Sequence, residues 1–211
     1  MVNKSGIQVD CLKKFTLPYY RLKELLRTGW VEKLDIENSE SVASHTLLMI
    51  VIVLFLANKY SYSCNKKMKL IEMVLIHDIA ESIVGDITPE TMSILKKRQT
   101  EDKAFEFILK NWLPNTLKEE LSSVWNEYKE DNTFDSNLIH MIDKLEMLMQ
   151  ANFYLEHREN VTIEQVAPFK KSVLSFVNKN CNFEAKRNLK IKSNENRELN
   201  EIKEILAYLS K

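Results

Sequence analysis

The chain has 211 residues, of which 45% are hydrophobic and 28% charged, enough for one domain with a full hydrophobic core. Thirty basic and thirty acidic side chains give a formal net charge of +0, so no overall field favours a nucleic-acid polymer or a membrane surface. The three cysteines, at positions 11, 64 and 181, lack CxxC spacing, which argues against a thiolate zinc site. With no signal-peptide pattern at the N-terminus, we expect a cytoplasmic protein that does not associate with membranes.

Apolar residues at helical spacing predict an all-α protein, and no hairpin signal interrupts them. The apolar run Leu47–Ala57 is too short to cross a bilayer and is expected to form a buried core helix. We expect a single domain over 1–211, with a motif-bearing core at about 20–157 and a C-terminal helical extension at about 160–211. The predicted helices span 17–28, 41–62, 67–83, 89–112, 115–130, 134–157, 162–179 and 195–209.

Two local signals refine the middle of the chain. Thr88-Pro89-Glu90 resembles a helix start, with an N-cap, a proline at the first helical position and an acid on the helix dipole. Gly85 permits the sharp turn before it. The charged run 96–103, "KKRQTEDK", is expected to form a solvated helix face.

The most informative stretch is "HDIAESIVGDITPE", His77 to Glu90, which places four carboxylates and a histidine directly after an apolar segment. No Lys or Arg occurs between Lys69 and Lys96, so another cation must balance these charges. On the predicted helix, Glu81 shares a face with His77 and Asp78. A metal ion is the natural counterion for such a cluster.

Other residues could complete a metal site. His45 begins the apolar helix, and Asp143 lies among apolar residues in "HMIDKLEMLM", where a carboxylate without a partner is costly. Together with His77 and Asp78 they form a set of two neutral and two anionic ligands. The remaining histidines, His140 and His157, are interpreted as structural or solvated.

The ordered pattern "RTGW", "ESVASH", "HDIAESIVGDITP" and "DKLE" resembles the HD-domain metal-dependent phosphohydrolases, and most closely the HD-domain 5′-deoxynucleotidases. This resemblance implies a single HD-domain helical bundle. It also implies an enzyme, a phosphoric monoester hydrolase. Its reaction would be hydrolysis of deoxyribonucleoside 5′-monophosphates to deoxynucleoside and phosphate by attack of a metal-bound water. Relatives are commonly homodimers, so a homodimer is expected.

The resemblance also implies residue roles. The expected metal ligands are His45, His77, Asp78 and Asp143. Glu81 and Asp86 match the catalytic acids, and the residues alone leave open which is acid and which is base. Arg27 matches an arginine near the substrate. Trp30 corresponds to a tryptophan that contacts the sugar, although in some relatives it follows the arginine directly, whereas Thr28-Gly29 intervene here.

Four protein ligands would close a tetrahedral zinc site. One divalent ion that accepts more ligands, Mn²⁺, Co²⁺, Fe²⁺ or Ni²⁺, is therefore expected ahead of Zn²⁺ or Mg²⁺. Two alternatives stay open. One is an HD-domain hydrolase of another nucleotide, such as an alarmone or a nucleoside triphosphate. The other is a non-catalytic module that binds metal or nucleotide. The sequence does not favour di-iron oxygenases or cyclic-nucleotide phosphodiesterases, because they need more histidine ligands.

Overall fold

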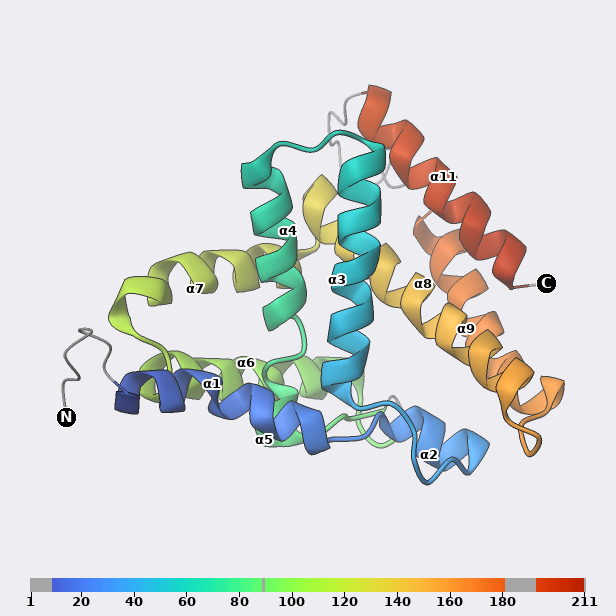
Figure 1. Ribbon diagram of the computed structural model, residues 1–211, viewed down its shortest axis with the longest axis horizontal. Helices are drawn as coiled ribbons and strands as arrows, with labels where there is room; N and C mark the ends of the chain where they lie inside the picture. Colours follow the sequence, from blue (N-terminus) through green and yellow to red (C-terminus); the bar gives the residue numbers. More distant parts are fainter. Residues whose placement is uncertain (1–8, 89, 181–192, 211) are drawn as a thin grey trace. The chain divides into compact units, whose positions relative to one another are not determined.

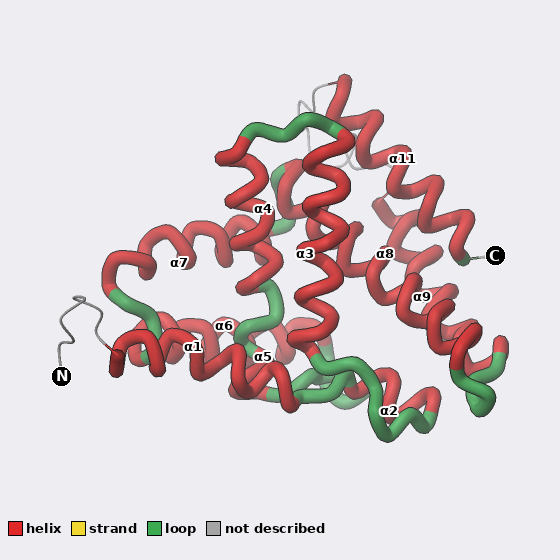
Figure 2. Tube along the Cα trace, in the orientation of Figure 1, coloured by secondary structure: helices red, strands yellow, loops and turns green. Residues whose placement is uncertain are grey.

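A computed structural model describes residues 9–88, 90–180 and 193–210 of the chain. Helices joined by short loops make up these ranges, and within them only one isolated bridge, Leu26 to Ser41, has β geometry (Figure 2). The expected all-α class is confirmed. Cys181 lies outside the described residues.

The helices follow the chain from the blue N-terminal end to the red C-terminal end (Figure 1). Their bounds are α1 (Val9–Glu24), α2 (Thr28–Leu34), α3 (Val42–Lys59), α4 (Cys64–Ile76), α5 (Glu81–Val84), α6 (Ile94–Asn111), α7 (Asn115–Glu130), α8 (Phe134–His157), α9 (Ile163–Asn180) and α11 (Ser193–Leu209).

These helices form two compact units. The first comprises the residues up to 47 together with 72–126, and the second comprises 48–71 together with the residues from 127 on. Helices α3, α4 and α7 each contribute residues to both units. The expectation of a single domain stays a prediction.

The second unit is held together by α8, α9 and α11, which lie side by side (Figure 1). Helix α11 buries Leu199, Ile202 and Leu206, spaced three and four residues apart as on one helical face. Polar contacts fasten it to the segment after α3, since the Tyr60 hydroxyl and Lys59 Nζ each donate to Glu201 at 2.6 Å. The predicted C-terminal helix is therefore present and packs on α8 and α9.

The first unit carries the acidic stretch. Helix α5 packs against both α1 and α6. The ring of Phe105 on α6 stacks on Trp125 of α7 with centroids 4.2 Å apart, which joins these two helices through aromatic contact. This packing fixes α5, the helix that follows the His-Asp pair.

Helix α3 is less buried than its composition predicts. It is long and apolar enough to cross a membrane by length and composition, a test that core helices of soluble proteins also pass, and 44% of it is buried. Leu47, Val51 and Phe55 are 64%, 51% and 66% exposed. The expected core helix is therefore present with one buried stripe, and its other stripe is exposed.

Several helix boundaries differ from those predicted. Helix α1 begins at Val9 and continues through Pro18, whose burial against the core offsets the backbone hydrogen bond that proline cannot make. Helix α2 is separate and was not predicted. Helix α6 begins at Ile94 after Ser93, so the start expected at Thr88-Pro89-Glu90 is wrong. Thr88 instead accepts backbone hydrogen bonds from Thr91 and Met92 in a turn, and Pro89 lies outside the described residues.

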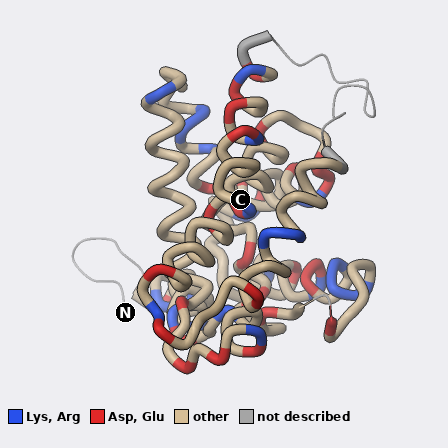
Figure 3. The backbone as a smooth tube through the Cα atoms, turned by 90° about the vertical axis from the view of Figure 1, so that its right-hand side faces the viewer, with Lys and Arg blue, Asp and Glu red and all other residues tan. Residues whose placement is uncertain are grey.

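Acidic and basic positions are interspersed along the described chain, as the red and blue segments of Figure 3 show. This agrees with the equal numbers of acidic and basic residues.

Candidate active site

His45 is placed by the first turn of α3. The Ser41 hydroxyl accepts a hydrogen bond from the Ser44 amide at 3.2 Å, as an N-cap residue does. The His45 amide then donates to the Ser41 carbonyl. His45 is 0% exposed, so the start of a well-defined helix holds its ring in the interior.

Arg27 is brought close to this helix by a short antiparallel pairing. The Arg27 amide donates to the Glu40 carbonyl at 3.0 Å, and the Val42 amide donates to the Leu25 carbonyl at 2.8 Å. These bonds close the loop that contains α2 and fix both of its ends. The guanidinium of Arg27 then lies 3.7 Å from the Asp78 carboxylate.

His77 and Asp78 lie in a turn, and not on a continuous helix as predicted. Helix α4 ends at Ile76, and the next residues make i to i−3 backbone bonds, from Ile79 to Ile76 and from Glu81 to Asp78. Adjacent residues of an α-helix point about 100° apart. Leaving the helix here allows the imidazole and the carboxylate to face one point.

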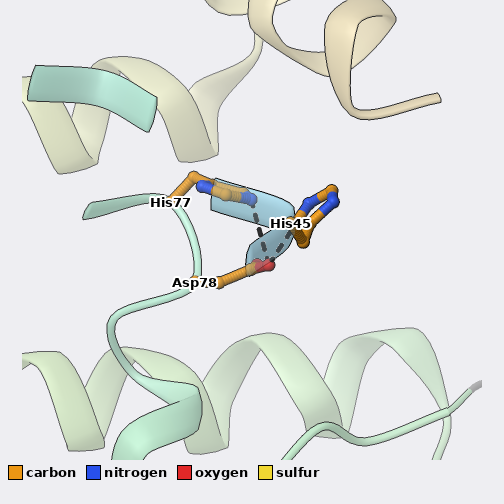
Figure 4. Close-up of side chains that lie close together, drawn as sticks. All are labelled: His45, His77 and Asp78. Atoms are coloured by element: carbon orange, nitrogen blue, oxygen red, sulfur yellow. Dashed lines mark ion pairs between the residues drawn. The ribbon is translucent and has the colours of Figure 1, made fainter. Parts of the chain in front are cut away.

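The three side chains His45, His77 and Asp78 converge (Figure 4). Asp78 Oδ2 lies 3.0 Å from His77 Nε2 and 3.9 Å from His45 Nε2. The ligand atoms of all three residues lie within 4.8 Å of one another. Two imidazole nitrogens and a carboxylate oxygen at this spacing are a donor set for one divalent transition metal.

The tautomer of His77 suits a metal ligand. Its Nδ1 lies 2.6 Å from the Val74 carbonyl, an acceptor, so Nδ1 carries the proton. In the neutral ring, the form that binds a metal, this leaves the lone pair on Nε2, the nitrogen that faces Asp78. A histidine oriented by a backbone carbonyl in this way is typical of metal sites.

The charge of Asp78 is stabilised despite its partial burial. Burial alone raises the pKa of this carboxyl. In the absence of a metal, the positive charge of protonated His77, then of His45 and Arg27, outweighs burial and holds the pKa below its usual range. Asp78 is therefore an anion at neutral pH, as a metal ligand must be.

Glu81 has the opposite electrostatic character. Burial, followed by the charges of Asp78 and Asp86, raises its pKa well above the usual value, and Lys97 opposes this only in part. The residue is 4% exposed. Lys97 Nζ lies 3.4 Å from Oε1. Oε2 is buried and has no hydrogen-bond partner within the described part of the chain. A buried carboxyl whose pKa is raised is suited to act as a general acid.

Asp86 is tied to the segment that carries Arg27. The Thr28 amide donates to Asp86 Oδ2 at 2.7 Å, and the Thr28 hydroxyl donates to the Asp86 carbonyl at 2.8 Å. Gly85 before it has a φ of 81°, a conformation that favours glycine. The turn at 85–86 expected from the sequence is therefore present, and it joins the acidic stretch to the start of α2.

Trp30 and Asp143 are the two remaining predicted site residues. Trp30 is 1% exposed and its indole N–H donates to Glu40 at 2.7 Å, a placement that favours a structural role, while its contact with a sugar stays a prediction. Asp143 lies on α8 in the second unit, where its carboxylate is 2.9 Å from Lys144 Nζ. It stays the predicted fourth ligand.

His140 has the structural environment that was expected. Its ring stacks on Tyr128 at 4.3 Å, and Nε2 lies 3.2 Å from the Tyr128 carbonyl.

The sequence interpretation missed two residues that contact the site, Lys97 and Thr28. The absence of any Lys or Arg between Lys69 and Lys96 was the available signal, because it left the bases that follow, Lys97 among them, to balance the acidic stretch. The structure supplies two cations there without a metal, because Arg27 faces Asp78 and Lys97 faces Glu81.

Comparison with known sequences gives consistent matches over most of the chain. A family model described as "HD domain" matches residues 19–182. The 5′-deoxynucleotidase HDDC2 of Homo sapiens is 32% identical over 157 residues, which cover 73% of this chain and 74% of that protein. The 5′-deoxynucleotidase hdd1 of Schizosaccharomyces pombe is 36% identical over 150 residues, which cover 69% of this chain and 70% of that protein.

Solved structures share the fold. A conserved hypothetical protein from Pyrococcus furiosus superposes with a TM-score of 0.65 at 25% identity, covering 95% of this chain and 99% of its own. A predicted metal-dependent phosphohydrolase from Magnetospirillum magnetotacticum superposes with a TM-score of 0.57 at 22% identity, covering 84% of this chain and 97% of its own. At this identity the second likeness supports the fold alone.

Proposed function

Because the chain belongs to the HD-domain family, we propose that it is a metal-dependent 5′-deoxynucleotidase that hydrolyses deoxyribonucleoside 5′-monophosphates to deoxynucleoside and phosphate. The observation that carries the proposal is the convergence of His45, His77 and Asp78 within 4.8 Å, with Arg27 beside them. Relatives named 5′-deoxynucleotidase support the substrate class.

The residues present fit a divalent metal. His45 and His77 would bind through imidazole nitrogens and Asp78 through a carboxylate oxygen, and Asp143 is proposed as the fourth ligand. A bound divalent ion polarises a phosphoryl oxygen and lowers the pKa of water. A mixed nitrogen and oxygen set supports Mn²⁺, Co²⁺, Fe²⁺ or Ni²⁺ ahead of Zn²⁺ or Mg²⁺.

Arg27 would hold the substrate phosphate. Its guanidinium already lies 3.7 Å from the Asp78 carboxylate, at the edge of the candidate metal site. A guanidinium binds phosphate oxygens through paired N–H donors and offsets charge that develops on them. Arg27 therefore orients the phosphoryl group toward the residues that carry the reaction.

The structure supports a division of roles that the sequence left open. Glu81 has a raised pKa and a buried Oε2, so it would donate a proton to the 5′ oxygen as that oxygen leaves phosphorus. Asp86, oriented by the Thr28 amide, would accept a proton from the attacking water or orient it. Water attacks phosphorus, the bond from phosphorus to the 5′ oxygen breaks, and the deoxynucleoside departs with the proton from Glu81.

We also propose that the protein is a homodimer. Support comes from the exposed apolar residues Val51, Leu54 and Phe55, which follow one another at helical spacing on α3. Phe55→Glu should shift the mass measured by light scattering from dimer to monomer, while Ile163→Glu, at an equally exposed residue of α9, should not. A monomeric wild-type protein would contradict the proposal. The cytoplasmic location and the absence of membrane association stay predictions.

The experiment that tests the function is phosphate release from deoxy- and ribonucleoside 5′-monophosphates. Metal-stripped protein is reloaded separately with Mn²⁺, Co²⁺, Ni²⁺, Zn²⁺ or Mg²⁺, with Asp78→Asn as the inactive variant and Asp10→Asn, at an exposed residue, as its matched control. Metal-dependent release that favours deoxynucleotides and is lost only in Asp78→Asn is the expected result.

Other outcomes identify the alternatives. Release from ribonucleotides alone would contradict the substrate class but not the metal site. Hydrolysis confined to alarmones or nucleoside triphosphates would identify a different hydrolase of the same family. Nucleotide binding without turnover under any metal would indicate a non-catalytic module.

A further inference from the structure

Lys97 reaches the candidate catalytic acids, although the charged run around it was expected to be solvated. From the first turn of α6, its Nζ donates to the Ile87 carbonyl at 2.8 Å and lies 3.4 Å from Glu81 Oε1. It also lies 3.5 Å from Glu101 on the same helix. The side chain is 29% exposed, whereas the preceding residue, Lys96, is exposed to solvent. The expectation of a solvated face is therefore wrong at Lys97.

These contacts join two segments that carry different proposed roles. Glu81 is the first residue of α5, and Ile87 directly follows Asp86. An ammonium group has three N–H donors and no acceptor, so it can hold a carboxylate and a carbonyl at once. Thr28 holds Asp86 from the other side through its amide and hydroxyl. The Asp86 segment is thus fixed at both Asp86 and Ile87.

The contact with Glu81 is also specific for one oxygen. Lys97 faces Oε1, while Oε2 is buried without a hydrogen-bond partner among the residues that the structure describes. A carboxyl that is free to rotate would present either oxygen. Holding Oε1 fixes which of the two oxygens, Oε2, is left without a protein partner among the described residues.

We infer that Lys97 is a positioning residue of the hydrolytic reaction, which fixes Glu81 through Oε1 and the Asp86 segment through the Ile87 carbonyl. This inference rests on the proposed roles of Glu81 and Asp86. Lys97 does not bind the phosphate itself, because its donors are directed at protein oxygens on α5, on α6 and after Asp86. Its effect therefore falls on the chemical step and not on substrate affinity.

The test compares steady-state kinetics of Lys97→Met, which keeps most of the length of the side chain but not its charge, with Lys96→Met as the matched control. In Lys97→Met, kcat should fall by on the order of 100-fold, the contribution typical of a positioned general acid, while KM changes less than about twofold. Bound metal, measured by mass spectrometry, should match the wild type. Lys96→Met should retain wild-type kinetics.

Rescue separates positioning from general loss of structure. Lys97→Ala should regain part of its kcat when ethylammonium or propylammonium is added, and uncharged propanol should give no gain. If the methionine variant does not fold, Lys97→Gln keeps an N–H donor for Ile87 without the charge and undergoes the same measurement. An increase in KM at unchanged kcat would overturn the inference, because it would make Lys97 a phosphate ligand.

A double variant distinguishes failure of this inference from failure of the proposed roles. If Glu81 is the acid and Lys97 positions it, Glu81→Gln lowers kcat, and adding Lys97→Met to that variant lowers kcat little further. If Glu81→Gln retains wild-type kcat, the role of Glu81 is wrong and the inference falls with it. If Glu81→Gln loses activity while Lys97→Met retains it, only the role of Lys97 is wrong.

Discussion

The Thr28 amide donates a 2.7 Å hydrogen bond to Asp86 Oδ2, across 58 residues of sequence. Thr28 is the first residue of α2, so the carboxylate also lies at the positive end of a helix. This bond joins the segment that carries Arg27 to the turn that carries a candidate catalytic acid. The residue proposed to bind phosphate and a residue proposed to transfer a proton are therefore linked through one contact.

Replacing Thr28 tests this coupling. Thr28→Val keeps the shape of the side chain and the amide bond to Asp86 but removes the hydroxyl donor, at an expected cost of about 1 kcal/mol in the free energy of unfolding. Because the Asp86 turn is loosened, kcat should also fall. Urea denaturation and kinetics measure both effects. Thr16→Val, at a threonine that bonds only within its own helix, should leave kcat unchanged, and an equal loss in both variants would contradict the coupling.

Removal of a metal ligand should lower metal affinity and the stability gained from metal. His45→Ala should bind the activating metal at least about 10-fold more weakly, whereas His157→Ala, at an exposed histidine, should not. A metal present at 100 times its Kd stabilises the folded protein by about 2.7 kcal/mol. A chelator should therefore lower the melting temperature of the wild type and have little effect on His45→Ala. Identical chelator sensitivity in the two proteins would place the metal elsewhere.

Arg27→Ala should weaken substrate binding as well as catalysis. Loss of a hydrogen bond between charged groups costs about 1.5–3 kcal/mol, so kcat/KM should fall by roughly 10- to 100-fold. Inhibition by inorganic phosphate should weaken in parallel. Because Arg27 also contacts Asp78, metal content is measured in the same samples. Arg98→Ala, at an exposed arginine of α6, is the control, and unchanged phosphate inhibition in Arg27→Ala would contradict the assignment.

Acid should weaken the attachment of α11 through Glu201. Hydrogen bonds from Lys59 and Tyr60 lower the pKa of Glu201 from 4.5 to about 2. Because the folded pKa lies below the unfolded value, the stabilisation is present above pH 4.5 and is lost as the pH falls toward 2. Glu198 has the opposite effect on stability in acid. Burial raises its pKa, so its protonation as the pH falls favours the folded state.

Urea denaturation between pH 7 and pH 3 measures this balance. Glu201→Gln should lose part of the pH dependence seen in the wild type, and the exposed Glu204→Gln should retain it. If the free energy of unfolding of Glu201→Gln depends on pH as in the wild type, the contacts of Glu201 do not contribute to stability. The comparison requires equal salt at each pH, because these groups lie at the surface.

The sequence predicted the fold class because helical spacing is a local property. Helices α7 and α8 begin and end at the expected residues. The end of α4 was mispredicted, because the apolar spacing continues through Ile79 and Ile83 while the chain leaves the helix after Ile76. No local pattern distinguishes a core helix from a turn lined by the same residues. Helix α2 was missed because seven residues give too little periodicity.

The candidate site was predictable where a motif fixed it and unpredictable where long-range packing did. Family resemblance brought His45 and His77 together, although 32 residues separate them. Lys97 looked like one more base in a charged run, because its long aliphatic stem allows it to reach inward from an outer helix. The burial of Trp30 and its bond to Glu40 likewise depend on the folded structure and have no signal in the local sequence.

The pairing of residues 25–27 with residues 40–42 allows the loop between them to change in length without moving the residues at its ends. Because two backbone hydrogen bonds clamp its ends, a change of length between them is absorbed inside the loop, and its entropic cost grows only slowly with added residues. Insertions next to the left-handed Asp35 should therefore leave the spacing of Arg27 and His45 intact. A change of length or shape elsewhere in this segment should likewise leave the positions of Arg27 and His45 unchanged.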